Sequence, residues 1–287
     1  MQNAAEKKLA TLIERLNTAR GYVDNFDSFI DFALFPFLAN PTEYQRKNFA
    51  EHRNDENYLN ALLTLGEAAE GYHDCFGEIF MDRISHGANG QFFTPESICE
   101  FMAKITDPIG ETINDCCCGS GRLLLQGLKN SREQGHEPWL YASDIDQRCC
   151  RMTLLNFCLN SARGVVTHMD ALLLEEWGAW HIDRVMIGGK WMSWVWYYTP
   201  GTDMDALNAE RRKQVEQLMS CGVFLETERP RAKTSGTPTE PKQEETPAAE
   251  PPQEAHITPP EAPKQETRVI PQIPKGKPVQ LEFDFFN

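Results

Sequence analysis

The sequence predicts an α/β protein in which a parallel sheet follows a helical N-terminal region. Near the N-terminus, apolar residues recur at the spacing of an amphipathic helix, as in Leu9, Leu12, Ile13 and Leu16. From Thr112 to Ile187, short apolar runs alternate with helical patterns in the order strand, helix, strand, helix, strand, strand. Beyond Glu226 the chain is rich in Pro, Glu and Thr, a composition that buries too little apolar surface to fold.

The chain is therefore expected to have four parts. Residues 1–85 form a helical subdomain, 86–225 an α/β domain, 226–279 a disordered linker rich in Pro and Glu, and 280–287 a short aromatic peptide. Within the helical part, Asp27 or Ser28 is the expected N-cap of the second helix, and Pro36 is expected to kink or end it.

Composition limits the partners and the compartment. The formal net charge of −14 gives no global positive field, so DNA binding would need a local basic patch or a basic partner subunit. The nine cysteines include adjacent ones but no C-x-x-C pair, which favours a reducing compartment and no zinc site. No signal peptide and no apolar run of ~18 residues is visible, so we expect a cytoplasmic protein with no membrane partner.

A glycine turn follows the first predicted strand. Asp115 ends that strand, and "DCCCGSG" then leads into a leucine-rich helix. Gly119 and Gly121 would let the backbone approach a ligand closely, and the free N–H groups of the helix start could meet its polar atoms. In parallel sheets, ligands bind beyond the carboxyl ends of the strands, where this turn lies.

Carboxylates also end the next two predicted strands. Asp144 is the candidate to hold a ribose diol, because a carboxylate can accept hydrogen bonds from two vicinal hydroxyls. Asp146 is the second choice, and the alternative is that it caps the following helix. Asp170 could accept a hydrogen bond from an exocyclic amine, or could instead cap a helix over "ALLLEEW". His168 is interpreted as a strand residue rather than a catalyst.

The segment "GQFFTP" precedes a predicted helix, "ESICEFMAKIT". Thr94 is its expected N-cap, Pro95 its first residue, and Glu96 lies in its first turn. At least one of Phe92 and Phe93 is expected to pack beneath this helix.

In order and spacing, "GQFFTPESICEFMAKI", "INDCCCGSGRLLL", "YASDID" and "THMDAL" resemble adenine-specific DNA methyltransferases of the gamma type, especially modification subunits of type I restriction systems. The resemblance covers about Asp82 to Ile187. It implies a Rossmann-like fold that binds S-adenosylmethionine behind a helical N-terminal region. It also implies a place for each site residue: the methionine side of the cofactor for Phe93, Thr94 and Pro95, its amino acid portion for Asp115, Cys118, Gly119 and Gly121, the ribose for Asp144, and the adenine amine for Asp170.

One motif of that family is missing. Its members carry Asn-Pro-Pro followed by Phe or Tyr after the fourth strand, where the Asn accepts hydrogen bonds from the target adenine and the ring stacks on the flipped base. Here the equivalent positions hold Gly188, Gly189, Lys190 and Trp191. Glycine has no side-chain acceptor and lysine only donates, so weak or lost catalysis is expected, although Trp191 could stack on a base. The alternative location for the motif is "ANPTEY", Ala39 to Tyr44.

The last residues suggest a partner. Gln280, Phe283, Phe285 and Phe286 resemble the peptides that dock on the bacterial DNA sliding clamp, with Phe in place of Leu; the alternative is that they pack on their own chain. The main functional hypothesis is adenine-N6 methylation of DNA, with DNA contacted through a partner specificity subunit. The alternatives are a non-catalytic adaptor that retains the cofactor fold, and a methyltransferase with another substrate.

Overall fold

The computed structural model describes residues 4–16, 21–86, 91–106, 112–187, 189–220 and 224–226. All of these lie in one compact unit, Met1–Lys233, and the second unit, Thr234–Asn287, lies outside the described residues. The linker and the aromatic peptide predicted for the C-terminal part therefore stay predictions, as does a domain boundary at residue 85.

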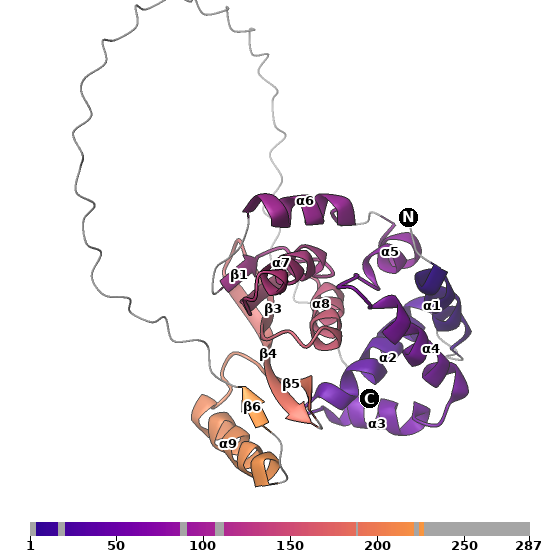
Figure 1. Ribbon diagram of the computed structural model, residues 1–287. Coiled ribbons are helices and arrows are strands. Elements are labelled where there is room, and N and C mark those ends of the chain that lie inside the picture. The colour runs from indigo at the N-terminus through magenta and orange to yellow at the C-terminus, as the bar shows by residue number, and fades with distance from the viewer. Residues whose placement is uncertain are drawn as a thin grey trace, which may run out of the picture. The chain divides into compact units, whose positions relative to one another are not determined.

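The N-terminal part is helical, as predicted. Its elements are α1 (Ala4–Arg15), α2 (Tyr22–Leu34), the 3-10 helix η1 (Phe35–Phe37), α3 (Glu43–His52), α4 (Glu56–Ala68), α5 (Gly77–Phe80) and the π-helical turn η2 (Met81–Ser85). Figure 1 shows these helices grouped together, and α2 packs on α8 (Gln147–Leu159). The α1 residues Leu9 and Ile13 are fully buried, which confirms the apolar stripe read from the sequence.

The predicted start of the second helix is wrong. Helix α2 begins at Tyr22 after Gly21, which has a φ of 104°. Asp27 instead bonds the guanidinium of Arg148 on α8, with its two carboxylate oxygens 3.0 and 3.1 Å from Arg148 Nε. Pro36 lies in η1 where α2 ends, as predicted.

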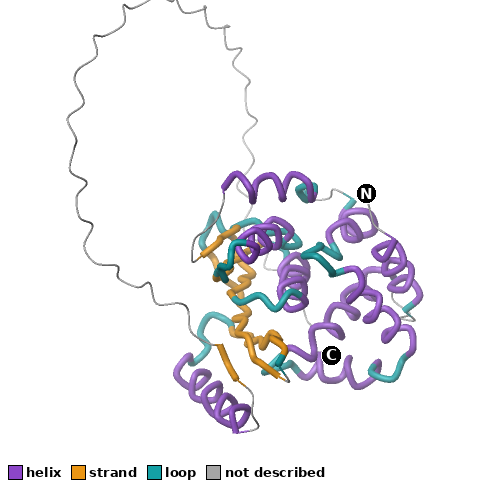
Figure 2. The backbone as a smooth tube through the Cα atoms, in the orientation of Figure 1, coloured by secondary structure: helices purple, strands orange, loops and turns teal. Residues whose placement is uncertain are grey.

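The sheet follows helix α6 (Glu96–Thr106) and begins as three parallel strands with helical crossovers. The order along the chain is β1 (Thr112–Asp115), α7 (Arg122–Glu133), β2 (Trp139–Asp144), α8 and β3 (Gly164–Asp170). β2 pairs with β1 on one side and β3 on the other, both parallel. The carboxyl ends of the three strands therefore meet at one edge of the sheet, which Figures 1 and 2 show as a continuous set of strands.

The remaining strands are antiparallel, contrary to the parallel arrangement expected for the fourth strand. β4 (Glu175–Ile187) pairs antiparallel with β3, so that Asp170 faces Glu175 and Gly164 faces Ile182. β5 (Lys190–Tyr198) pairs with β4 along its length, and β6 (Phe224–Glu226), which follows α9 (Met204–Ser220), also pairs with β4. Because residues 171–174 form a turn rather than a helix, β4 can return only antiparallel to β3.

Candidate cofactor-binding site

The glycine turn after β1 requires both of its glycines. Gly119 has a φ of +54°, and a Cβ placed there would lie 3.0 Å from the ring of Phe93. Gly121 has a φ of +79°, and a Cβ there would lie 2.9 Å from Thr153 on α8. These left-handed conformations and close approaches exclude a side chain, so the turn leaves bare backbone under Phe93. Thr153 donates to the Gly119 carbonyl at 2.9 Å, which fixes the turn against α8.

Asp144 at the end of β2 contacts this turn directly. Its Oδ2 accepts a hydrogen bond of 2.9 Å from the Gly119 N–H, and its Oδ1 accepts one of 2.9 Å from the Asp146 N–H. Burial raises the pKa of the Asp144 carboxyl above its ordinary value, and these two backbone hydrogen bonds oppose that rise. Each carboxylate oxygen retains a lone pair, so Asp144 can still accept from a ligand.

The neighbouring acids Asp115 and Asp146 accept hydrogen bonds from backbone N–H groups two residues further along the chain. Asp115 Oδ1 accepts from the Cys117 N–H at 3.0 Å. Asp146 is the N-cap of α8, accepting from the Arg148 N–H at 2.8 Å, as the alternative interpretation of this residue required. Cys118 is buried, and burial raises the pKa of its thiol well above the ordinary value, so it packs as a neutral group.

Asp170 closes the β3–β4 turn. Its Oδ1 accepts from the N–H groups of Leu172 and Leu173 at 2.8 and 2.9 Å. This is the capping role considered as the alternative, but it caps a turn, because the helix expected over "ALLLEEW" does not form. The ring of His168 lies 4.7 Å from that of Trp177, which agrees with its interpretation as a strand residue.

The aromatic-Thr-Pro segment lies beside the turn. Phe93 is partly buried and stacks on Phe80 with ring centroids 5.7 Å apart, whereas Phe92 is 77% exposed. Helix α6 spans Glu96–Thr106, the whole of the predicted "ESICEFMAKIT", but Pro95, expected as its first residue after an N-cap at Thr94, lies ahead of it. The Thr94 carbonyl accepts from Arg122 Nη1 at 3.0 Å, which connects this segment to the helix after the glycine turn.

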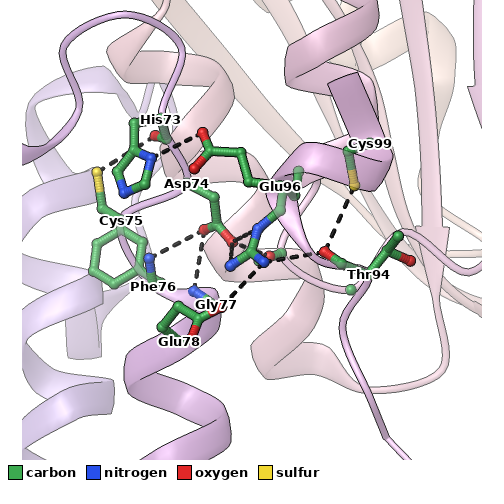
Figure 3. A network of polar contacts seen from close by, with 12 residues as sticks. His73, Asp74, Cys75, Phe76, Gly77, Glu78, Thr94, Glu96 and Cys99 are labelled. Carbon is green, nitrogen blue, oxygen red and sulfur yellow. Dashed lines mark hydrogen bonds and ion pairs between the residues drawn. The ribbon is translucent and has the colours of Figure 1, made fainter. Parts of the chain in front are cut away.

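A buried carboxylate that the sequence reasoning missed supports both segments. Asp74 is fully buried; its Oδ2 accepts from Ser120 Oγ at 2.6 Å and from Arg122 Nε at 2.9 Å. Its Oδ1 accepts from the N–H groups of Phe76 and Gly77 at 3.1 Å each (Figure 3), and from Asn156 Nδ2 at 2.9 Å. A carboxylate with this many donors is fully satisfied, so it can hold Ser120 and Arg122 rigidly. The signal in the sequence was Ser120 within the glycine turn and Arg122 at the first position of the leucine-rich helix, two polar residues that the structure buries.

His73, next to Asp74, joins two other helices. Its Nε2 lies 2.7 Å from Glu6 Oε1 on α1, and its Nδ1 lies 2.9 Å from Glu96 Oε1 on α6, the second contact being visible in Figure 3. The hydrogen bonds to Glu6 and then Glu96 raise the pKa of His73 to about 10, so at neutral pH it is a cation between two carboxylates.

The substituted motif lies at the other end of the sheet. Because β4 runs antiparallel, residues 183–187 extend past the amino end of β3, and the turn into β5 with Gly189, Lys190 and Trp191 follows there. The Trp191 carbonyl accepts from Ser161 Oγ at 2.9 Å, just before β3 begins. Placing these residues at the carboxyl ends of the strands was therefore wrong, and Trp191 is not beside Asp144.

The alternative segment "ANPTEY" does not supply a free hydrogen-bond acceptor for an adenine either. Both ends of the Asn40 amide bond the backbone of Tyr197, its Nδ2 donating at 2.8 Å and its Oδ1 accepting at 3.0 Å. Thr42 caps α3 through Gln45 in a capping box. This segment lines a cavity of about 270 Å³ with Trp180 and Tyr197, which is lined by none of the residues of the glycine turn.

Some predicted residues lie outside the described chain, namely Gly188, Gln280, Phe283, Phe285 and Phe286. Within the described ranges, no group of three or more His, Cys, Asp or Glu side chains is arranged to hold a metal ion. The described helices include none with the length and apolar character needed to cross a membrane.

The β1–α7–β2–α8–β3 unit, with its glycine turn under Phe93 and its acid at the end of β2, is a Rossmann-like arrangement of parallel strands joined by helical crossovers. The chain belongs to the N-6 DNA methylase family, whose model matches residues 73–217, just over half of its length. That match begins at His73 and so includes Asp74.

Similar proteins cover only parts of this chain. It is 30% identical over 128 residues, or 40% of its length, to the type I restriction enzyme MpnII methylase subunit of Mycoplasma pneumoniae, and 34% identical over 80 residues, or 27%, to the EcoEI methylase subunit of Escherichia coli. The matches span 24% and 16% of those relatives. A solved structure described as a class I S-adenosylmethionine-dependent methyltransferase from Listeria monocytogenes is 15% identical with a TM-score of 0.42, covering 60% of this chain and 55% of that one.

Proposed function

We propose that the chain binds S-adenosylmethionine at the carboxyl ends of β1, β2 and β3 and serves adenine-N6 methylation of DNA. The observation that carries the proposal is the hydrogen bond of 2.9 Å from the Gly119 N–H to Asp144 Oδ2. It joins the acid at the end of β2 to the backbone left bare by the glycines. Membership of the N-6 DNA methylase family supports the reaction class.

Each site residue has a role in this proposal. Asp144 accepts hydrogen bonds from the ribose hydroxyls with its remaining lone pairs. Asp170 offers Oδ2 to the adenine amine, because only its Oδ1 bonds the turn. Phe93, Thr94 and Pro95 line the methionine side, while Asp115, Cys118, Gly119 and Gly121 surround the amino acid portion. The cofactor, when bound, supplies a methyl group on a sulfonium.

The chain lacks the motif that would bind the target adenine, which is the methyl acceptor. The sequence has no Asn-Pro-Pro, and Gly189 to Trp191 follow a strand that leads away from Asp144. Loss of a preorganised acceptor commonly costs about 100- to 1,000-fold in rate. The chain alone therefore transfers methyl groups slowly or not at all. By analogy with the type I methylase subunits, it works with a partner that contacts DNA, which the net charge of −14 also favours.

Calorimetry with S-adenosylmethionine tests the cofactor site. The wild-type chain should bind, and Asp144→Ala should lower affinity at least about tenfold, since it removes an acceptor at the centre of the site. Asp203→Ala is the matched control, because Asp203 makes comparable backbone hydrogen bonds at the start of α9. No binding by the wild-type chain, or equal affinity of the two variants, would reject the site.

Methyl transfer from labelled S-adenosylmethionine to DNA lacking adenine methylation tests the proposed role in adenine-N6 methylation. We expect little transfer by the purified chain. Rapid transfer by the chain alone would contradict the proposal that loss of the Asn-Pro-Pro motif slows or abolishes methyl transfer. Transfer to RNA or protein in preference to DNA would instead support the alternative of another substrate.

The proposed clamp-docking peptide has a separate test. Deleting residues 280–287 should abolish retention of the chain on immobilised bacterial sliding clamp. Retention that is unchanged by the deletion, or absent from the intact chain, contradicts clamp docking.

A further inference from the structure

The cavity of about 270 Å³ lies between the helices α2 and α3, the start of α8, and the strands β4 and β5. Its walls are tied to one another. The Asn40 amide bonds the Tyr197 backbone in both directions, and Leu38 forms a parallel bridge with Val195, so β5 lies beside η1 (Figure 1). Residues 189–191, which stand in place of the missing motif, do not line this cavity. It is therefore separate from both of the regions considered so far.

Two aromatic rings form the side of the cavity that faces the sheet. The centroids of the Trp180 and Tyr197 rings are 5.0 Å apart, and their planes are inclined by 40°. Gly178 leaves room for Tyr197, because a Cβ at Gly178 would lie 2.5 Å from the Tyr197 hydroxyl. Within the described chain, neither this hydroxyl nor the Trp180 indole N–H makes a hydrogen bond. Both rings can therefore contact a planar ligand and also bond its polar edge.

An ion pair lies on the helical side of the cavity. Asp31 on α2 is 7% exposed, and its Oδ2 lies 2.9 Å from Arg151 Nη2 on α8. The Asp31 carboxylate also accepts from the Gln45 side chain, which leaves about two of its four acceptor positions open. Arg151 Nη1 has only a 3.5 Å contact with Asp27, so it retains an N–H. The pair thus offers an acceptor beside a donor.

The charge of the lining excludes an anionic ligand. The charges of Asp31 and Arg151 cancel, and burying a phosphate there without further cations would be costly. The remaining polar residues of the lining are uncharged, namely Asn40, Thr42, Tyr44, Gln45 and Gln147. A neutral ligand with a donor next to an acceptor matches this lining best.

These features together fit an aminated nucleobase such as adenine or cytosine. Its exocyclic amine would donate to Asp31, the ring nitrogen beside the amine would accept from Arg151, and the ring would lie against the aromatic side chains. Pockets for drug-sized ligands occupy about 300–1,000 Å³, so this cavity suits a single base or nucleoside. We propose that the cavity binds a nucleobase carrying such an amine, at a site separate from that of the cofactor. This inference does not rest on cofactor binding or methyl transfer.

Equilibrium dialysis of labelled adenine against the full-length chain tests the specificity of the site. Hypoxanthine has a carbonyl in place of the amine, and this oxygen would face the Asp31 carboxylate. Adenine should therefore compete at least about tenfold better than hypoxanthine, since a site built for a hydrogen-bond donor rejects the analogue that lacks it. No binding of adenine, or equal competition by the two bases, overturns the proposal.

Two mild substitutions locate the bound base. Gln147→Ala removes an exposed side chain that has no partner in the described chain, and Tyr197→Phe removes a single hydroxyl. Each should weaken adenine binding about threefold. Tyr198→Phe is the matched control, because successive residues of a strand face opposite sides and Tyr198 does not line the cavity. Loss of adenine binding in Asp144→Ala, with wild-type affinity in both cavity variants, would place the base in the cofactor site and overturn the proposal.

Competition with two larger ligands identifies the source of the base. Displacement of labelled adenine by adenosine, and not by a single-stranded adenine oligonucleotide, supports a site for a free nucleoside. Displacement by the oligonucleotide that is weakened in Gln147→Ala and Tyr197→Phe supports a base presented by a nucleic-acid strand. Displacement by the oligonucleotide that neither substitution alters contradicts binding of the base in this cavity.

Discussion

The carboxylate of Asp74 lies 2.9 Å from Nε of Arg122, and this buried pair joins the helical N-terminal region to the helix that follows the glycine turn. Arg122 also donates to the Thr94 carbonyl at 3.0 Å. One ion pair thus fixes the relative positions of the two segments proposed to hold the cofactor. It acts on the site through positioning, since neither side chain is exposed.

Removing one partner of the Asp74–Arg122 pair should lower the free energy of unfolding substantially. Arg122→Met keeps most of the apolar stem but leaves the Asp74 charge without its cation, which typically costs about 3–5 kcal/mol of unfolding free energy. Urea unfolding of the variant and the wild type measures this loss of unfolding free energy. Lys47→Met, at the exposed Lys47–Glu51 pair, should cost less than about 1 kcal/mol. Similar small losses in both variants would mean that the buried pair contributes little.

The glycine turn allows backbone strain to be separated from steric contact. Gly135 has a φ of +80° with nothing within 4 Å of its Cβ position, so Gly135→Ala should cost about 1–2 kcal/mol from the backbone alone. Gly121→Ala should cost more, because its Cβ would lie 2.9 Å from Thr153. Chemical unfolding of the two variants compares these costs directly. Equal costs would show that α8 yields to the added methyl group.

Gly119→Ala should act on the ligand as well as on stability. Its Cβ would lie 3.0 Å from the Phe93 ring and displace it from the place proposed for the methionine side of the cofactor. Calorimetry should show S-adenosylmethionine affinity lowered at least about tenfold for Gly119→Ala and unchanged for Gly135→Ala. Unchanged affinity in both would exclude Phe93 from the ligand contacts.

The local features of the site were predictable because they depend on neighbouring residues. Gly119 and Gly121 signal a turn with positive φ, and Asp146 before a helical run signals an N-cap; both are in the structure. The direction of β4 was not predictable in this way. "ALLLEEW" suits a helix, yet Asp170 bonds two N–H groups of a tight turn, and pairing with β3 and β5 decides the outcome.

Contacts between distant parts of the chain were also hidden from the sequence. Asp74 and Arg122 are 48 residues apart, and no periodicity connects them. Asp27 is of a residue type that favours N-caps, but its carboxylate accepts a hydrogen bond from Arg148 instead. Only the packing of α2 on α8 brings these two residues together.

The reversed strand makes a prediction about Trp191. Its ring lies under the Arg184 guanidinium, 4.9 Å from the centroid, at the edge of the sheet away from Asp144. Trp191→Ala should therefore cost about 0.5–2 kcal/mol of stability and leave S-adenosylmethionine affinity unchanged, in calorimetry beside Phe93→Ala as the variant expected to lose affinity. Loss of affinity in Trp191→Ala would place this residue in the site after all.

His73 should make stability depend on pH in the alkaline range. Its pKa is about 6.5 in an unfolded chain and about 10 in the folded one, so folding favours the protonated form. The stabilisation is therefore fully present below pH 6.5 and is lost as the pH rises to about 10. His73→Gln should be less stable than wild type by roughly 1–3 kcal/mol at pH 6, a value moderated by the partial exposure of Glu96, and the difference should shrink by pH 10. Urea unfolding at both pH values measures it, with the exposed His136→Gln as control. A constant difference between His73→Gln and wild type would show that the imidazolium is not what joins Glu6 to Glu96.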